Sequence, residues 1–331
     1  MRQRDKDRLS HIENTFYLNF QLTRLYKSYL ENFPEAISED MIKDLCSDGA
    51  IEIKDAIVAL LSELFGIDIE RSVEDRKFIR EYIYPSVRLL NKEKYTENPY
   101  YKNVKIKNVK DGSWELRWES YAPFRGVICD DMVICDDMKE YAPLGFFTEK
   151  FDFPAVLENG NEWMTLTPVD MDTCEDAINR ASGKVVTFGL GLGYFAYMAS
   201  LKESVSEVTV VELSEDVIKL FKKHILPFFP HPEKIRIVNA DAFKYAEFEM
   251  PKKNFDFAFV DTWRDASDGT PMYKRMRALE HLSPNTEFSY WIERFLISRI
   301  RAEKYIDLCQ KLDTGTDLDY KSFINELQKI T

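Results

Sequence analysis

The chain has 331 residues, of which 45% are hydrophobic and 14% aromatic, and its formal net charge is −12 at pH 7. That length predicts two or three domains, with enough apolar residues for a core in each. The net negative charge argues against a nucleic-acid backbone as substrate, because phosphate binding needs clustered lysine and arginine.

Three further features of the sequence bear on the cellular location of the protein. No apolar run approaches the roughly 18 residues of a membrane helix, and the charged segment 1–7 lacks the apolar core of a signal peptide. The five cysteines are odd in number and scattered, which does not fit a disulfide framework. We expect a cytoplasmic protein with neither a membrane nor a nucleic-acid partner.

Residues 1–98 are predicted to form a helical domain. Leu18, Leu22 and Leu25 share one helical face. A further helix around residues 78–90 contains Pro85, which should interrupt or kink it. We expect this domain to cover a substrate or to form a dimer contact, which leaves a homodimer open.

After residue 98 the sequence pattern changes from helical to alternating, and residues 99–170 are predicted to form a small β-rich unit. Asp111-Gly112 lies between the alternating segments 104–107 and 114–118, and this pattern is typical of a β-hairpin. A second strand pair is expected to flank Asn159-Gly160.

A glycine-rich turn begins the last predicted domain, residues 171–331. The apolar strand 184–188 ends in Gly189, Gly191 and Gly193, and an amphipathic helix follows at once. Glycine lets the backbone turn sharply and approach a ligand, and the new helix points unpaired N–H groups at it. A dinucleotide fingerprint would need its third glycine at Tyr194, so the alternate spacing favours S-adenosylmethionine instead.

Each later strand of this domain also ends at a polar residue. Strand 208–211 ends in Glu212, strand 235–238 leads to Asp241, and strand 255–260 ends at Asp261. The carboxyl ends of parallel strands form the usual ligand edge of an α/β sheet, and an acid after the second strand can accept both ribose hydroxyls.

Residues 180–262 resemble the class I S-adenosylmethionine-dependent methyltransferase fold, and most closely its spermidine-synthase-like branch. The segments 211–217 and 231–243 are similar to motifs of that branch, which also carries a small β unit before its nucleotide fold. The resemblance implies a Rossmann-like α/β sheet, preceded here by the β-rich unit and the helical domain.

The resemblance also implies roles for single residues. The three glycines would lie along the methionine part of the cofactor, Glu212 would hold the ribose and Leu213 would pack on adenine. Asp241 would accept from the adenine amino group beside the Ala242 backbone, and Asp261 would face the reacting end.

Three features depart from the family pattern. Thr187 stands where the family often has an acid, so the ammonium of the cofactor needs another partner. Leu192 replaces the acid that polyamine synthases usually carry in this loop. A fifth strand is expected over residues 287–292, and residues 293–331 are predicted to be mainly helical. We therefore predict that the terminal antiparallel hairpin of the family is missing.

The loop after the fourth strand holds the candidate catalytic and substrate-binding residues. Asp261 or Asp265 could act as a general base, and Trp263 could contact a cation. The alternative is that the acids of this loop cap the next helix. Trp163 and Tyr290 are expected to face the substrate or to lie in the core.

A repeated Ile-Cys-Asp-Asp-Met at 128–132 and 134–138 could suggest a metal site, but its mixed soft and hard ligands suit no common metal. We expect a pair of short strands with an acidic turn and no metal.

The sequence predicts a methyltransferase that uses S-adenosylmethionine on a small molecule. The alternatives are an aminopropyltransferase that uses the decarboxylated cofactor, and a nucleotide-binding protein without catalysis on the same fold.

Overall fold

The computed structural model describes residues 3–68, 70–313 and 322, and the chain divides into two compact units. Unit 1 comprises Met1–Leu90, Tyr121–Lys150 and Arg294–Thr331, and unit 2 comprises Asn91–Ser120 and Phe151–Glu293. The predicted domain boundaries after residues 98 and 170 do not coincide with these units. The β-rich segment divides between them, and the last helix groups with unit 1.

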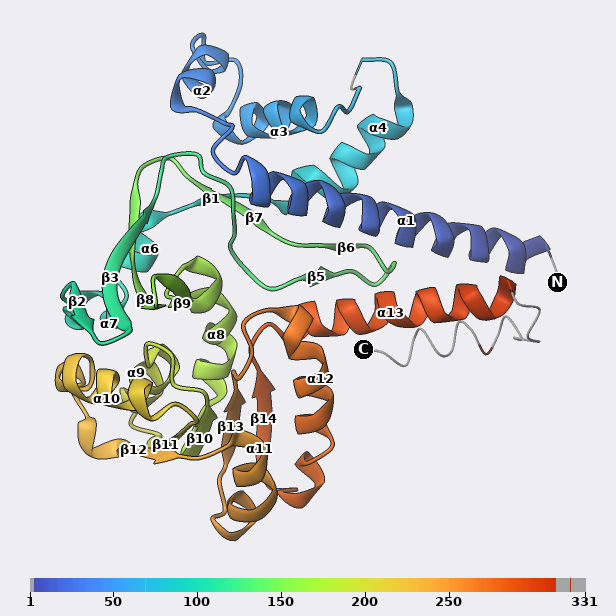
Figure 1. Ribbon diagram of the computed structural model, residues 1–331. Helices are drawn as coiled ribbons and strands as arrows, with labels where there is room; N and C mark the ends of the chain where they lie inside the picture. The colour runs from blue at the N-terminus through green and yellow to red at the C-terminus, as the bar shows by residue number, and fades with distance from the viewer. Residues whose placement is uncertain (1–2, 69, 314–321, 323–331) are drawn as a thin grey trace. The chain divides into compact units, whose positions relative to one another are not determined.

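Unit 1 is mainly helical, as the sequence predicts for its first ninety residues. Ser38 and Ser72 start two of its helices by accepting from the N–H groups of Met41 and Asp75. Its helices are α1 (Gln3–Asn32), α2 (Glu39–Leu45), α3 (Ile53–Leu64), α4 (Val73–Phe78), the π-helical turn η1 (Ile79–Ile83), α5 (Tyr84–Ser86) and α13 (Glu293–Asp313) (Figure 1).

The predicted helix over residues 78–90 starts earlier and ends earlier than expected, because α4, η1 and α5 form one continuous helical run over residues 73–86. Pro85 lies near the end of this run, directly after the π-helical turn η1, and the chain leaves α5 as strand β1 (Val87–Leu90). β1 pairs in parallel with β7 (Leu144–Phe147), which pairs with β4 (Val127–Ile128). β5 (Val133–Ile134) and β6 (Glu140–Tyr141) form a separate antiparallel pair.

A buried ion pair explains why α13 belongs to unit 1. Arg301 and Glu140 are only 5% and 6% exposed, and Arg301 Nε lies 2.7 Å from Glu140 Oε1. Ser298 Oγ donates to the other carboxylate oxygen at 2.6 Å. The Asp131 carboxylate accepts from the N–H groups of Arg294 and Phe295, both at 3.0 Å, and so caps α13.

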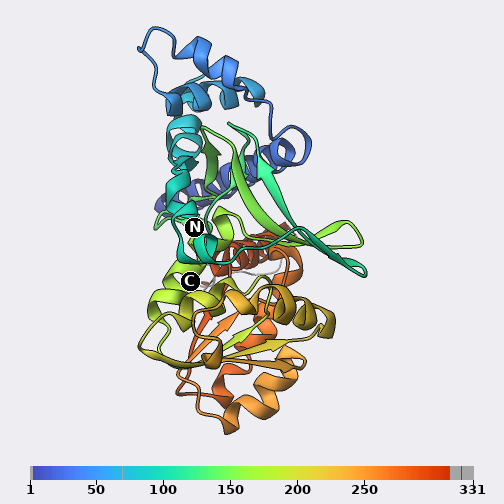
Figure 2. The same cartoon turned by 90° about the vertical axis from the view of Figure 1, so that its left-hand side faces the viewer.

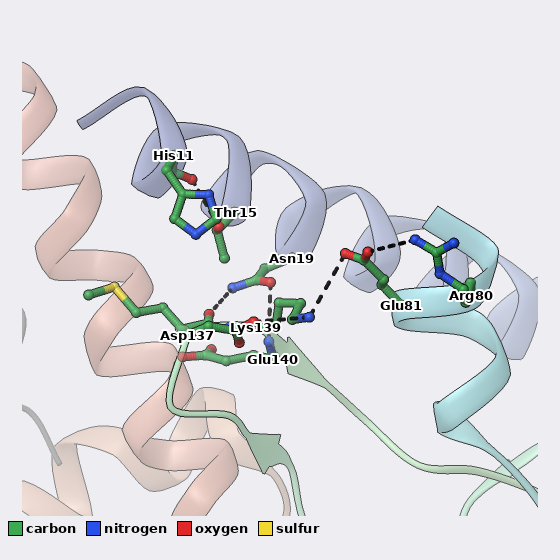
Figure 3. A network of polar contacts seen from close by, with 9 residues as sticks. His11, Thr15, Asn19, Arg80, Glu81, Asp137, Lys139 and Glu140 are labelled. Carbon is green, nitrogen blue, oxygen red and sulfur yellow. Dashed lines mark hydrogen bonds and ion pairs between the residues drawn. The ribbon is translucent and has the colours of Figure 1, made fainter. Parts of the chain in front are cut away.

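Asn19 of α1 holds the turn between β5 and β6, as Figure 3 shows. Its amide donates to the carbonyl oxygen of Met138 at 2.9 Å, and its side-chain oxygen accepts from the Glu140 N–H at 3.1 Å. Lys139 of the same turn contacts Asp137 at 3.0 Å and Glu81 at 3.9 Å. Because Asn19 is 5% exposed, both hydrogen bonds are sheltered from water.

We expect Asn19→Ala to lower the free energy of unfolding by about 1–2 kcal/mol, because it leaves a buried donor and a buried acceptor unpaired. Urea denaturation of the full chain measures this. Asn32→Ala is the matched control, since Asn32 lies in an exposed position near the end of the same helix. Equal losses in the two variants would contradict the assigned role of Asn19.

Unit 2 contains a parallel sheet in the order β12-β11-β10-β13-β14. The first strand in the chain lies in the middle, so the chain first builds one half of the sheet and then returns to build the other. The strands are β10 (Gly183–Phe188), β11 (Val205–Glu212), β12 (Ile235–Asn239), β13 (Phe257–Val260) and β14 (Glu287–Tyr290). This confirms the predicted parallel α/β sheet.

The helices of unit 2 between residues 168 and 277 lie on both sides of that sheet (Figures 1 and 2). The α-helices are α6 (Lys92–Thr96), α7 (Pro99–Asn103), α8 (Pro168–Arg180), α9 (Tyr194–Ser200), α10 (Glu215–His224), α11 (Ala242–Lys244) and α12 (Ala266–Arg277). Short turns η2 (Leu226–Phe228), η3 (Pro232–Lys234), η4 (Tyr245–Glu249), η5 (Met250–Lys252) and η6 (Glu280–Leu282) complete the connections.

Both predicted hairpins are present in a four-stranded sheet of order β2-β3-β8-β9. β2 (Val109–Asp111) and β3 (Trp114–Tyr121) meet at a two-residue turn, but the predicted strand over residues 104–107 is wrong, because the first strand of this hairpin begins only at residue 109. β8 (Phe151–Glu158) and β9 (Asn161–Thr165) flank Asn159-Gly160, whose φ angles are 52° and 81°. Two positive φ angles are typical of the turn that matches strand twist.

After β14 the described part of the chain continues as α13, without a further strand, in line with the prediction of a missing hairpin. Residues 314–321 and 323–331 lie outside the described residues. Among the helices that the structure describes, none is long and apolar enough to cross a membrane.

Candidate functional site

A small pocket lies at the carboxyl ends of β10 and β13, entirely within unit 2. It opens between the glycine loop (residues 189–193), the start of α9 and one face of α8. The residues that line it are Met164, Leu166, Asp170, Cys174, Thr187, Gly189, Leu190, Tyr194, Phe195, Ala196, Phe259, Asp261 and Trp291. This is the edge at which the sequence predicts ligand binding.

The glycine loop brings two strand ends into close contact. Gly189 has a φ of +100°, and a Cβ there would lie 1.9 Å from the carbonyl oxygen of Asp261. Any other residue would push β13 away from β10. Gly193 closes the loop and begins α9, and its N–H donates to the Leu190 carbonyl at 2.7 Å.

Glu212 at the tip of β11 is held by the loop itself. One carboxylate oxygen accepts from the Leu190 N–H at 3.1 Å and the other from the Ser214 N–H at 2.7 Å. Each oxygen keeps a second lone pair with which it can accept from a hydroxyl. Leu213, the next residue, is 70% exposed and offers an apolar platform beside this carboxylate.

Residues at and after the carboxyl end of β12 lie at the same ligand edge of the sheet and stabilise its backbone. Asp241 caps α11 by accepting from the Lys244 N–H at 2.9 Å, and Ala242 begins that helix. Asn239, which the sequence reading did not select, donates to the carbonyl oxygens of Glu212 and Leu213 at 3.0 and 2.8 Å. Asn239 therefore fixes the backbone that carries the carboxylate and the apolar platform.

Two carboxyl groups line the pocket with raised pKa values. Burial first, and then the nearby charges of Asp170 and Glu212, raise the pKa of Asp261 to about 8. Burial raises the pKa of Asp170 to about 6, although the N–H and hydroxyl of Thr167 donate to its carboxylate at 2.7 and 2.8 Å. The pocket lining that the structure describes contains no lysine, arginine or histidine, so it favours a cationic ligand.

Asp170 was missed because its sequence context has a simpler meaning. Thr167 and Asp170 form a capping box at the start of α8, and such a pattern alone predicts only a helix start. In the structure both Asp170 and Thr187 line the pocket. The pocket thus has a carboxylate in addition to Thr187, the position at which the sequence departs from the family pattern that it resembles.

Among the predicted substrate residues, Trp163 and Tyr290 each lie one position before a residue that lines the pocket, and Trp263 lies two positions after Asp261. Trp163 packs edge-on against Trp114 at 5.4 Å, while its neighbour Met164 reaches the pocket. Tyr290 stacks with Trp263 at 6.4 Å and donates to Glu280, while Trp291 reaches the pocket. Successive side chains of a strand point to opposite faces, so the sequence located both strand ends but not the pocket-facing residue.

Asp265 starts α12 as its N-cap, with one carboxylate oxygen accepting from the Ser267 N–H at 2.6 Å. Asp268 completes a capping box by accepting from the Asp265 N–H at 3.1 Å. This matches the alternative reading of the loop as a helix cap, and Asp265 does not line the pocket.

The repeated Ile-Cys-Asp-Asp-Met segments each contain a short strand end, but β4 pairs with β7 and β5 with β6, not with each other. Within the described ranges, no three His, Cys, Asp or Glu side chains gather as metal ligands would.

No protein-family model matches the chain, and a search of curated proteins finds no match. Among solved structures, the chain is similar to a spermidine synthase in complex with the transition-state analogue AdoDATO, with 17% identity and a TM-score of 0.32 over 43% of this chain and 54% of that one. It is also similar to spermidine synthase from Thermotoga maritima, with 15% identity and a TM-score of 0.31 over 56% and 65%.

The chain therefore spans between half and two thirds of these solved structures. The strand order of unit 2 by itself identifies a parallel α/β sheet.

Proposed function

We propose that unit 2 binds S-adenosylmethionine and transfers its methyl group to a small molecule. The observation that carries this proposal is the set of three carboxyl groups around one glycine loop, with aromatic walls and no cation among the described lining residues. Glu212 would accept from the ribose hydroxyls, Leu213 would support adenine, and Asp241 with the Ala242 backbone would bind the adenine edge. Asp170 is the proposed partner of the ammonium that Thr187 cannot hold.

Bound S-adenosylmethionine would supply an electrophilic methyl group on a positively charged sulfur. The side chains of Tyr194, Phe195, Phe259 and Trp291 would exclude water and face the positive charge with their rings. Asp261 would hold or accept a proton at its carboxyl group. A bound cation lowers the pKa of a neighbouring carboxyl, so Asp261 would be ionised and able to take a proton from an amine or hydroxyl acceptor.

Aminopropyl transfer is the second candidate. The decarboxylated cofactor and its amine acceptor are both cationic, and the carboxyl groups of Asp170 and Asp261 suit them as well. Against this, the glycine loop offers Leu192 instead of an acid. A nucleotide-binding protein without catalysis is the third candidate, because fold alone does not fix function.

Two labelled assays on the same preparation distinguish these candidates. In one, methyl-labelled S-adenosylmethionine is incubated with a panel of small amines and phenols. In the other, decarboxylated cofactor is incubated with putrescine, and Glu212→Gln protein serves as the control in both. We expect labelled, methylated product in the first assay and no spermidine in the second. Spermidine in the second alone would establish aminopropyl transfer, and binding without any product would favour the non-catalytic candidate.

A further inference from the structure

The side chain of Met164 lies across the glycine loop. Met164 belongs to β9, where it pairs with Val156 of β8. The Leu192 N–H donates to its sulfur at 3.2 Å. A Cβ on Gly191 would lie 1.9 Å from that sulfur and 2.6 Å from the ε-methyl carbon. The thioether therefore covers the loop at Gly191 and Leu192, directly after the two loop residues, Gly189 and Leu190, that line the pocket.

The loop peptide is fixed, whereas Met164 can move. The buried Tyr100 hydroxyl donates to the Leu192 carbonyl at 2.5 Å, so it anchors the Leu192–Gly193 peptide, which directly follows the peptide that donates to Met164. Methionine has three freely rotating side-chain bonds and no branch, so its end can swing aside at small cost. Displacement would therefore involve the side chain and leave the loop backbone in place.

The hydrogen bond between Leu192 and Met164 is also a weak one. A thioether sulfur is a poor acceptor, while a carboxylate accepts from the same N–H in a shorter and roughly twice stronger bond. A ligand that brings a carboxylate to this N–H would replace the sulfur with a gain in hydrogen-bond strength. A ligand that ends short of the loop would leave Met164 where it is.

We infer that Met164 is a specificity-determining residue that the amino-acid tail of a cofactor displaces from the glycine loop, so that it weakens the binding of tailed nucleosides, and that only a tail whose carboxylate reaches the Leu192 N–H offsets this loss. The inference rests on the proposed function for the identity of the ligand. The position of Met164 on the loop is independent of it.

Two nucleosides test the inference: S-adenosylhomocysteine, which has the amino-acid tail, and 5′-methylthioadenosine, which lacks it. The full chain is labelled with ¹³C on the methionine methyl groups, and Met164→Leu identifies the Met164 resonance. We expect S-adenosylhomocysteine to shift this resonance and 5′-methylthioadenosine to leave it in place. Amide exchange at Leu192 should be at least several-fold faster in Met164→Ala than in the wild type.

Calorimetric titration gives a second readout. Met164→Ala removes the side chain that the tail must displace, so it should bind S-adenosylhomocysteine about three- to tenfold more tightly, which is the scale of one weak hydrogen bond. Its affinity for 5′-methylthioadenosine should stay within about twofold of the wild type. Because the resonance shift is measured on wild-type protein, a poorly folded variant does not remove the test.

The outcomes separate the two claims. Binding of S-adenosylhomocysteine with an unmoved Met164 resonance, or equal effects of Met164→Ala on both nucleosides, would overturn this inference and leave the proposed function intact. Failure of both nucleosides to bind either protein would overturn the proposed function and the inference with it.

Discussion

Replacing Asp261 with asparagine should reduce the rate of methyl transfer by about 10²–10⁴-fold, the usual contribution of a positioned general base. The side chain keeps its shape but can no longer accept the proton of the acceptor. In the wild type, the rate at low cofactor concentration should rise with pH through about 8, where half of the Asp261 carboxyl groups are ionised, and level off above that pH. Initial rates between pH 6 and 9 measure both effects.

The same replacement should stabilise the fold near pH 8. Burial raises the pKa of Asp261 from its ordinary 3.8 to about 8, so between these values the folded protein holds a proton that the unfolded chain has released. The free energy of unfolding of the wild type therefore falls as pH rises through this window, by up to about 1.4 kcal/mol per pH unit. Asparagine carries no such proton, so its advantage should grow from pH 4 to pH 8 and then level off.

Glu203→Gln is the control for the Asp261 experiments, because it removes an exposed carboxylate from the same unit. It should change neither the rate nor the pH dependence of stability. An Asp261→Asn enzyme with wild-type rates at all pH values would remove Asp261 from the chemistry, whatever its effect on stability.

Replacing Glu212 with glutamine should weaken S-adenosylmethionine binding by about 10- to 100-fold, the cost of hydrogen bonds to a charged group. Glutamine keeps one side-chain oxygen for the Leu190 or Ser214 N–H, so the loop retains part of its support. It lacks the second oxygen that the ribose hydroxyls need. Titration calorimetry of wild type and variant measures the difference.

Glu215→Gln is the matched control for Glu212. It removes the same charge three residues later, from an exposed position on α10. Its affinity for the cofactor should equal that of the wild type. If the Glu212 and Glu215 variants bind equally well, the cofactor does not use the tip of β11.

The strand ends of unit 2 could be predicted from sequence because each has a local signal. Gly189, Glu212, Asp241 and Asp261 each follow a short apolar run, and the structure places all four runs in one parallel sheet. The turn residues at Asn159-Gly160 likewise fixed a hairpin, since their φ angles are positive.

Met164 and Asp170 could not be found in this way. Asp170 is part of a helix cap, which explains its presence without a ligand. Met164 directly follows Trp163, and an aromatic residue is the more usual candidate for a pocket wall. Met164 reaches the pocket from β9 and Asp170 from the start of α8, and this placement is a tertiary property. The grouping of α13 with unit 1 has the same origin, because it depends on the buried pair of Glu140 and Arg301, far apart in sequence.

A crystal structure of the full chain with S-adenosylhomocysteine tests the central claim most directly. We predict the ribose within hydrogen-bond distance of the Glu212 carboxylate, the adenine on Leu213 with its amino group at Asp241, and the sulfur facing the pocket of Asp170 and Asp261. A ligand bound away from the glycine loop, or crystals that take up none at saturating concentration, would contradict the account.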